Sequence, residues 1–140
     1  MSAAPKIAGV LETALYVEDL DRAAAFYEDV LGLKLINKDQ RFAGYMAGPR
    51  SVLLLFKRGS TLETVHLPGG TIPPHDGQGT LHVAFAIDAD ALAPWEAHLG
   101  TNDIAIEGRT DWPRGGKSIY FRDPDNHLLE LATPGLWPNY

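Results

Sequence analysis

The chain has 140 residues, of which 45% are hydrophobic and 21% are charged, as is usual for a soluble globular protein. Its formal net charge of −6 argues against a surface that tracks nucleic-acid phosphates, and no apolar run reaches the roughly 20 residues that span a bilayer. The sequence contains no cysteine, so any metal must be held by His, Asp or Glu. Residues 1–6 lack the apolar core of a secretory signal. We therefore expect a single domain over residues 1–140, located in the cytoplasm, with neither nucleic acid nor membrane as a partner.

The first half of the chain predicts a strand, a helix and three short strands. Residues 9–17 alternate in the manner of a strand, and Asp19 or Asp21 supplies a carboxylate that can cap the helix that follows. Apolar residues recur at helical spacing through 22–31, and Gly32 stands where a left-handed residue ends a helix. Three further strands are expected at 33–38, 41–47 and 51–57.

Residues 58–79 form a junction that is rich in proline and glycine, and we expect no regular element there. A loop of this length inside a compact domain is usually functional, so it is predicted to border and gate a pocket. The second half then predicts a strand at 80–87, a helix at 91–99 and a turn at 123–126. Three more strands are expected at 104–107, 117–122 and 128–132.

The two halves look like two copies of one unit. Residues 11–17 and residues 81–87 both alternate as strands, and both carry a side chain that can bind a metal at the second position. These side chains are Glu12 in the first copy and His82 in the second. The same position in two copies of a unit is a natural place for two halves of one site.

A second pair of segments closes each copy. Residues 51–56 correspond to residues 127–132, and Leu54 then stands where the second copy has Glu130. Three of the four equivalent positions therefore carry a possible metal ligand. We expect an α+β fold in which two tandem βαβββ modules, with curved mixed sheets, form a metal-binding trough. The modules are placed at about 7–57 and 80–133.

The order of these motifs resembles the vicinal oxygen chelate superfamily, which includes glyoxalase I, extradiol dioxygenases, fosfomycin-resistance proteins, bleomycin-binding proteins and methylmalonyl-CoA epimerase. The segments that carry the resemblance span nearly the whole chain, at residues 15–27, 30–33, 81–85 and 120–131. The resemblance implies a small-molecule substrate and a divalent metal ion, either Fe, Mn, Ni, Co or Zn. It places the ligands at Glu12, His82 and Glu130.

The resemblance also implies a homodimer, because members of the family are commonly dimeric. Two small sheets in each chain leave edges and apolar faces that a second copy can cover. The trough is built either within one chain or across the dimer. In the second case, Glu12 of one subunit meets His82 and Glu130 of the other.

Leu54 departs from the family pattern. In bacterial glyoxalase I the corresponding position resembles a Glu that binds the metal and helps to move a substrate proton, and leucine can do neither. The three remaining ligands favour a metal-dependent enzyme on a small oxygen-chelating substrate, with lyase or isomerase chemistry of the glyoxalase type. An extradiol-type Fe(II) dioxygenase is the first alternative. A non-catalytic binding protein of the bleomycin type is the second.

Five further residues are candidates for contact with the substrate. His75 is predicted as an acid–base group, because its ordinary pKa suits proton transfer near neutral pH; a solvated loop residue is the alternative. Arg114 is a candidate to hold a carboxylate or phosphonate, and otherwise a surface charge. Ser118 and Tyr120 share one face of a strand and resemble substrate contacts of the fosfomycin-resistance proteins, and Tyr120 is also a catalytic candidate. Tyr45 is a candidate pocket residue, with core packing as the alternative.

Overall fold

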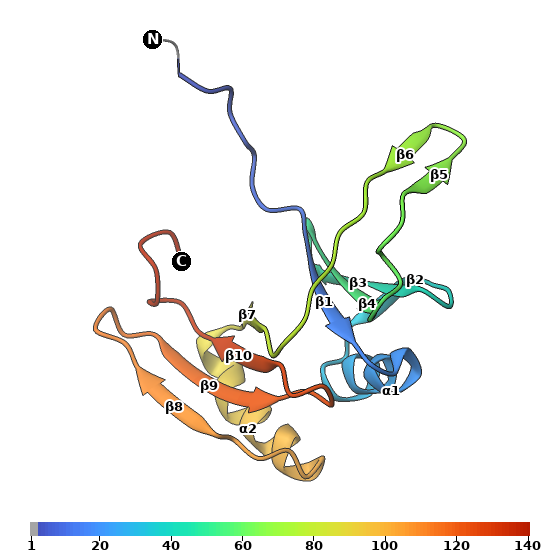
Figure 1. Cartoon of the computed structure of the whole chain (residues 1–140). Coiled ribbons are helices and arrows are strands. Elements are labelled where there is room, and N and C mark those ends of the chain that lie inside the picture. Colours follow the sequence, from blue (N-terminus) through green and yellow to red (C-terminus); the bar gives the residue numbers. More distant parts are fainter. Residues whose placement is uncertain (1–2) are drawn as a thin grey trace.

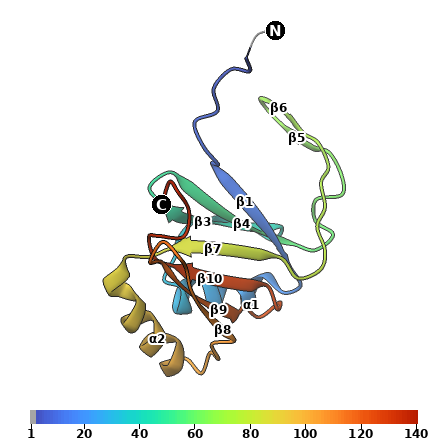
Figure 2. The same cartoon turned by 90° about the vertical axis from the view of Figure 1, so that its left-hand side faces the viewer.

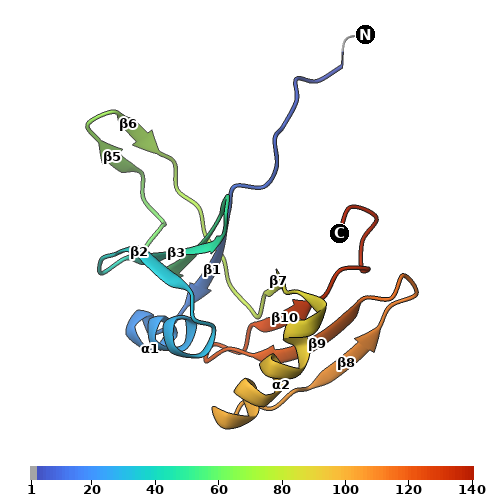
Figure 3. The same ribbon diagram turned by 180° about the vertical axis from the view of Figure 1, so that it is seen from behind.

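The computed structural model describes residues 3–140 and contains two four-stranded sheets and one small hairpin (Figure 1). The order of one strand, one helix and three strands occurs twice, which confirms the predicted α+β fold of two βαβββ modules. Each module is an open sheet with its helix against one face (Figure 3). No helix among the described residues is long and apolar enough to cross a bilayer.

The first module forms a sheet in the order β1-β4-β3-β2, in which β1 is parallel to β4. The predicted helix at 22–31 starts earlier and changes type, because its second half is π-helical. Of the two proposed caps, Asp19 is the one used: its carboxylate accepts a hydrogen bond from the Arg22 backbone N–H at 3.0 Å. The elements are β1 (Glu12–Val17), α1 (Leu20–Ala25), η1 (Phe26–Val30), β2 (Lys34–Lys38), β3 (Phe42–Gly48) and β4 (Ser51–Lys57).

The second module repeats this sheet in the order β7-β10-β9-β8. The strand expected at 104–107 is displaced: Ile104 and Ile106 pack against the core, and β8 begins at Gly108. Only the end of the expected segment is bonded to β9, because the Glu107 N–H donates to the Tyr120 carbonyl at 2.8 Å. The elements are β7 (His82–Ala86), η2 (Ala89–Ala91), α2 (Leu92–Thr101), β8 (Gly108–Asp111), β9 (Lys117–Arg122) and β10 (Leu128–Ala132).

The junction between the modules contains a regular element that the sequence analysis excluded. Strands β5 (Val65–Leu67) and β6 (Gly70–Ile72) pair as an antiparallel hairpin that projects away from both sheets (Figure 1). Leu67 pairs with Gly70, so Pro68 and Gly69 form the two-residue turn between them. The prolines and glycines of this stretch build a hairpin turn instead of preventing strands.

The pairing register confirms that the two modules are equivalent. Ala14 of β1 lies beside Leu54 of β4, just as Ala84 of β7 lies beside Glu130 of β10. Leu54 and Glu130 thus occupy the same place in the two sheets. In the first sheet the opposite face carries Leu15, Leu53, Leu55, Ala43 and Tyr45, which are buried in one core with α1 and η1.

The turn before β10 joins the two modules within the chain. His127 is fully buried; its Nδ1 accepts a hydrogen bond from the Leu81 backbone N–H at 2.8 Å, so its Nε2 carries the proton and donates to the Tyr16 carbonyl at 2.7 Å. The Tyr27 hydroxyl donates to Asp123 at 2.7 Å, and burial together with this carboxylate raises the pKa of Tyr27 well above its usual value. The first strands of the two modules run close together (Figure 2).

Candidate metal and substrate site

His82 and Glu130 meet on the exposed face of the second sheet. The Nε2 atom of His82 lies 3.2 Å from Oε1 of Glu130. The Nδ1 atom of His82 lies 2.8 Å from the carbonyl oxygen of Leu128, which can only accept, so Nδ1 carries the proton. In the neutral ring the lone pair is then on Nε2, the atom that faces Glu130. This is the arrangement of a histidine that is oriented for metal binding by a backbone carbonyl.

Glu130 is a buried carboxylate, with only 5% of its surface exposed. Its second oxygen, Oε2, accepts a hydrogen bond from the Ser118 hydroxyl at 2.5 Å, and Ser118 in turn accepts one from the Trp112 indole at 2.8 Å. A buried carboxylate without partners would be costly. Ser118, itself fixed by Trp112, therefore holds the carboxylate so that Oε1 points to His82.

The other candidates of the second module lie at different distances from this pair. Tyr120 is the cross-strand neighbour of Glu130, and its ring centroid is 6.4 Å from that of His82. Ser118 is buried, and its hydroxyl is engaged with Glu130. Arg114 is exposed in the turn between β8 and β9. The structure thus brings Ser118 and Tyr120 to the pair, and leaves Arg114 at the rim of the sheet.

Glu12 lies apart from this pair within one chain. Among residues 3–140, no three His, Asp or Glu side chains gather as a metal site would require. Glu12 is exposed on the edge strand β1, where it borders a hollow of about 290 Å³ on the open face of the first sheet. The hollow is also lined by Thr13, Ala14, Arg41, Leu54, Phe56, Ile72 and His75.

His75 enters that hollow from the junction and is tied to β1. Thr61 Oγ1 donates to the His75 carbonyl at 2.5 Å, so it accepts the hydrogen bond of the Tyr16 hydroxyl at 2.8 Å. The Tyr16 oxygen then accepts from Nδ1 of His75 at 2.6 Å. This order of donors leaves the lone pair of the neutral His75 ring on Nε2. The junction therefore borders the hollow of Glu12, whereas His66 lies exposed on the β5–β6 hairpin.

Tyr45 is a correction to the sequence analysis. Its side chain is fully buried, and its hydroxyl donates to Glu28 of η1 at 2.9 Å. Burial, followed by the hydrogen bond to Glu28, raises the pKa of Tyr45 above its ordinary value. Tyr45 faces the helix and not the hollow, because alternation along β3 puts it on the covered side of the sheet. It is a core residue and not a substrate contact.

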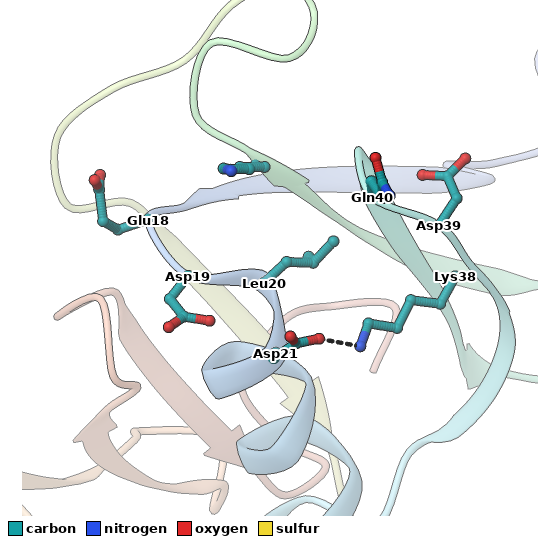
Figure 4. A pocket seen from close by; sticks show the side chains of 8 residues that line it. Glu18, Asp19, Leu20, Asp21, Lys38, Asp39 and Gln40 are labelled. Atoms are coloured by element: carbon teal, nitrogen blue, oxygen red, sulfur yellow. Dashed lines mark hydrogen bonds and ion pairs between the residues drawn. The ribbon is translucent and has the colours of Figure 1, made fainter.

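A more voluminous hollow than that of Glu12 lies elsewhere (Figure 4). It has a volume of about 860 Å³, and its wall is made of exposed charged side chains around the start of α1 and the end of β2. Lys38 donates to Asp21 at 2.5 Å across it, and this hydrogen bond lowers the pKa of Asp21. None of the candidate ligands borders it, so size alone does not mark the site here.

Several residues that line or support the Glu12 hollow were not candidates from the sequence, among them Tyr16, Thr61 and Arg41. Tyr16 shares the strand face of Glu12, and the alternation of β1 was a signal for it. Thr61 and Arg41 gave no signal, because each is brought to the site by contacts between segments far apart in sequence.

The model of the Glyoxalase/Bleomycin resistance protein/Dioxygenase superfamily matches residues 9–131. The chain belongs to this superfamily. The match covers both modules and confirms the resemblance stated for the sequence. One relative in the superfamily is the metallothiol transferase FosB of Staphylococcus saprophyticus subsp. saprophyticus, which is 32% identical over 118 residues, or 84% of this chain and 71% of the relative.

Solved structures agree with this assignment. The crystal structure of a lactoylglutathione lyase from Agrobacterium tumefaciens has a TM-score of 0.86 and 33% identity, and covers 96% of this chain and 99% of the other. The fosfomycin resistance protein FosX from Mesorhizobium loti has a TM-score of 0.63 and 24% identity, and covers 91% of this chain and 93% of its own. The second likeness shows the superfamily fold alone.

Proposed function

We propose that the chain is a metal-dependent enzyme of the superfamily that acts on a small oxygen-chelating substrate, with Glu12, His82 and Glu130 as the ligands of one divalent ion. The observation that carries the proposal is the oriented pair of His82 and Glu130. Each side chain has one polar atom held by the fold and the other turned toward its neighbour. Among the described residues, Nε2 of His82 and Oε1 of Glu130 are therefore the two atoms of the pair that are free of other partners and could bind one ion together.

The donor set fits a divalent ion of the oxygen–nitrogen type. One imidazole nitrogen and two carboxylates suit Mn, Fe, Co, Ni or Zn, and three protein ligands leave room for a substrate. When bound, such an ion would act as a Lewis acid that polarises a substrate oxygen. Ser118 keeps Glu130 in position, and Leu128 does the same for His82 through its carbonyl.

The site is proposed to lie between two copies of the chain. Within one chain only two of the three ligands meet, so the third carboxylate must come from another copy. A second copy would also cover apolar side chains next to Glu12 that are exposed in one chain. These are Ile7, Val10 and Leu11, with 84%, 82% and 65% of their surface exposed.

Lyase or isomerase chemistry of the glyoxalase type requires a base, and His75 is the residue we propose for it. Its Nε2 carries the lone pair, and the side chain lines the hollow of Glu12. Tyr120, beside His82, is proposed to donate a hydrogen bond to the substrate, and Arg114 stays a candidate for an anionic substituent. Deprotonation by a positioned imidazole contributes about 10²–10⁴-fold to a rate.

Transfer of a thiol is the second candidate. The observation that favours it is Leu54, which removes the carboxylate that the first sheet would otherwise offer for proton abstraction. Addition of a thiolate to an activated electrophile does not need that carboxylate. The relative named metallothiol transferase FosB is similar along 84% of this chain.

The proposal is tested on the purified protein loaded in turn with Mn²⁺, Ni²⁺ and Zn²⁺. Metal content is measured by mass spectrometry, and turnover is measured with the hemithioacetal of methylglyoxal and with fosfomycin plus a thiol. His75→Ala should lower isomerase turnover by about 10²-fold or more with unchanged metal content. His66→Ala, the matched change in the exposed hairpin, should keep full activity. If the wild-type protein binds none of these ions, the proposal is refuted. If His75→Ala keeps wild-type isomerase turnover, the base is another residue.

A further inference from the structure

Arg41 is a cation without an acidic partner in the hollow that holds Glu12. Among the described residues no ion pair involves Arg41, although other arginines of the chain are paired with carboxylates. The side chain is only partly exposed. The paired arginines are Arg22, Arg58, Arg109 and Arg122. In a chain with more acidic than basic residues, an arginine left unpaired inside a hollow needs an explanation.

The backbone of Arg41 is fixed on both sides. Its N–H donates to the Asp39 carboxylate at 2.7 Å, and its carbonyl accepts hydrogen bonds from the Lys57 N–H at 2.9 Å and from the Ser60 hydroxyl at 3.2 Å. The position of the residue at the start of β3 is therefore set by the fold. A ligand would not have to order this part of the chain.

The guanidinium group is held as well, by two aromatic rings. Its central carbon lies 5.4 Å from the ring centroid of Phe42 and 5.6 Å from that of Phe56. Stacking on aromatic rings pre-organises the planar donors of arginine without using up its N–H groups. Those donors stay available for a partner with two oxygens.

His75 packs against one of the same two rings, that of Phe56. Its imidazole lies 5.1 Å from the Phe56 centroid in an edge-to-face arrangement, with Nδ1 engaged by Tyr16. Between these groups and Glu12 the hollow is lined mainly by apolar side chains, which are Ala14, Leu54, Phe56 and Ile72. A volume of about 290 Å³ admits a small molecule and not a large one.

We propose that Arg41 binds the anionic end of the substrate, a carboxylate or a phosphonate, while the oxygen-bearing end faces Glu12. The inference rests on the proposed function, because it places the substrate in the hollow that contains Glu12, and it names the substrate class as small organic anions with an apolar middle. A charge-assisted pair of hydrogen bonds from arginine discriminates such an anion from a neutral analogue.

The test compares a charged probe with a neutral one of the same shape. Glutarate, glutaramate and 3-phosphonopropionate are titrated calorimetrically into the protein, both metal-free and loaded with Mn²⁺. Wild type should prefer glutarate over glutaramate by about 10-fold or more, and Arg41→Gln should remove this preference. Arg41→Lys should keep part of it, because the charge remains but the planar donors are lost. Whichever of glutarate and 3-phosphonopropionate binds more tightly shows whether the anionic group is a carboxylate or a phosphonate.

Arg50→Gln is the matched control. Arg50 is exposed in the turn between β3 and β4, outside the hollow, and its substitution changes the net charge by the same amount. Equal losses in Arg41→Gln and Arg50→Gln would show general charge attraction and overturn the inference. The inference is also overturned if light scattering shows that Arg41→Gln no longer forms the dimer while the variant still prefers glutarate over glutaramate. If wild type binds no Mn²⁺, the proposed function fails, while the preference of the metal-free protein still decides the role of Arg41.

Discussion

Ser118 supports the candidate metal ligand Glu130 through a single hydrogen bond. It lies one strand away from Glu130 and is itself almost completely buried. Its hydrogen bond occupies Oε2 of Glu130, and the Trp112 indole occupies Ser118. This chain of three side chains leaves only Oε1 of Glu130 facing His82. The alternation along the strand placed Ser118 and Tyr120 on one face, but it gave no sign of the hydrogen bond from Ser118 to Glu130.

Replacing Ser118 should weaken metal binding more than folding. Ser118→Ala removes the hydrogen bond that orients Glu130, and loss of such a support typically costs about 10–100-fold in metal affinity. Affinity for Mn²⁺ and Zn²⁺ is measured by isothermal titration calorimetry, with thermal unfolding as a check on the fold. Thr110→Ala, the cross-strand neighbour on β8, is the control and should bind the ions like wild type. Equal metal affinities in Ser118→Ala and Thr110→Ala would show that Ser118 does not support metal binding.

At the scale of elements, the turn between β9 and β10 determines how the two modules sit on each other. It makes hydrogen bonds to three places in the first module. Asp123 accepts from Tyr27, Asp125 accepts from the backbone of Glu18 at 2.8 Å, and His127 donates to the backbone of Tyr16. His127, directly after the turn, thus links the Leu81 backbone of the second module to the Tyr16 backbone of the first.

His127→Leu should therefore destabilise the whole protein. It keeps a side chain of similar size but leaves the Leu81 N–H without its acceptor and the buried Tyr16 carbonyl without its donor. Each unsatisfied group costs about 1–3 kcal/mol, so we expect a loss of roughly 2–5 kcal/mol in the free energy of unfolding. Urea titration followed by circular dichroism measures it. His66→Leu, in the exposed hairpin, should stay within about 0.5 kcal/mol of wild type; a comparable loss there would contradict the assignment.

At the scale of the whole molecule, one chain presents the two halves of the proposed site on separate open faces. Glu12, Arg41 and His75 belong to the face of the first module, and His82 and Glu130 to that of the second. Strands β1 and β7 are both edges of their sheets. The proposed dimer would bring the first face of one chain to the second face of its partner, and so form two sites by symmetry.

Mixing two inactive variants tests this directly. Glu12→Gln and Glu130→Gln should each bind little metal alone. In a mixed dimer one site has both substitutions and the other has neither, so random exchange of subunits should restore about one quarter of the wild-type metal content. A site built within one chain would restore nothing, because every chain then carries one altered ligand. Metal content per chain is measured after refolding the mixture, with each variant refolded alone as the control.

The sequence by itself determined the two modules and the proximity of His82 and Glu130. Strands at 117–122 and 128–132 have the predicted bounds, since alternating residues and a turn of Asp, Pro and Asn specify them locally. The pairing of His82 with Glu130 was predictable from the repeat. Parallel strands of one unit bring corresponding positions together in a fixed register, which the structure repeats in the first module.

Only the tertiary structure decided which face of each strand is covered and which distant segments meet. Alternation shows that Tyr45 and Leu54 lie on opposite faces of the first sheet, but the packing of η1 decides that Tyr45 is buried. Arg41 and His75 come to one hollow through contacts with the junction and β4, which leave no periodic signal. The separation of Glu12 from Glu130 likewise depends on how the two modules join. Local sequence specifies each module, but it does not specify which surface its open face contacts.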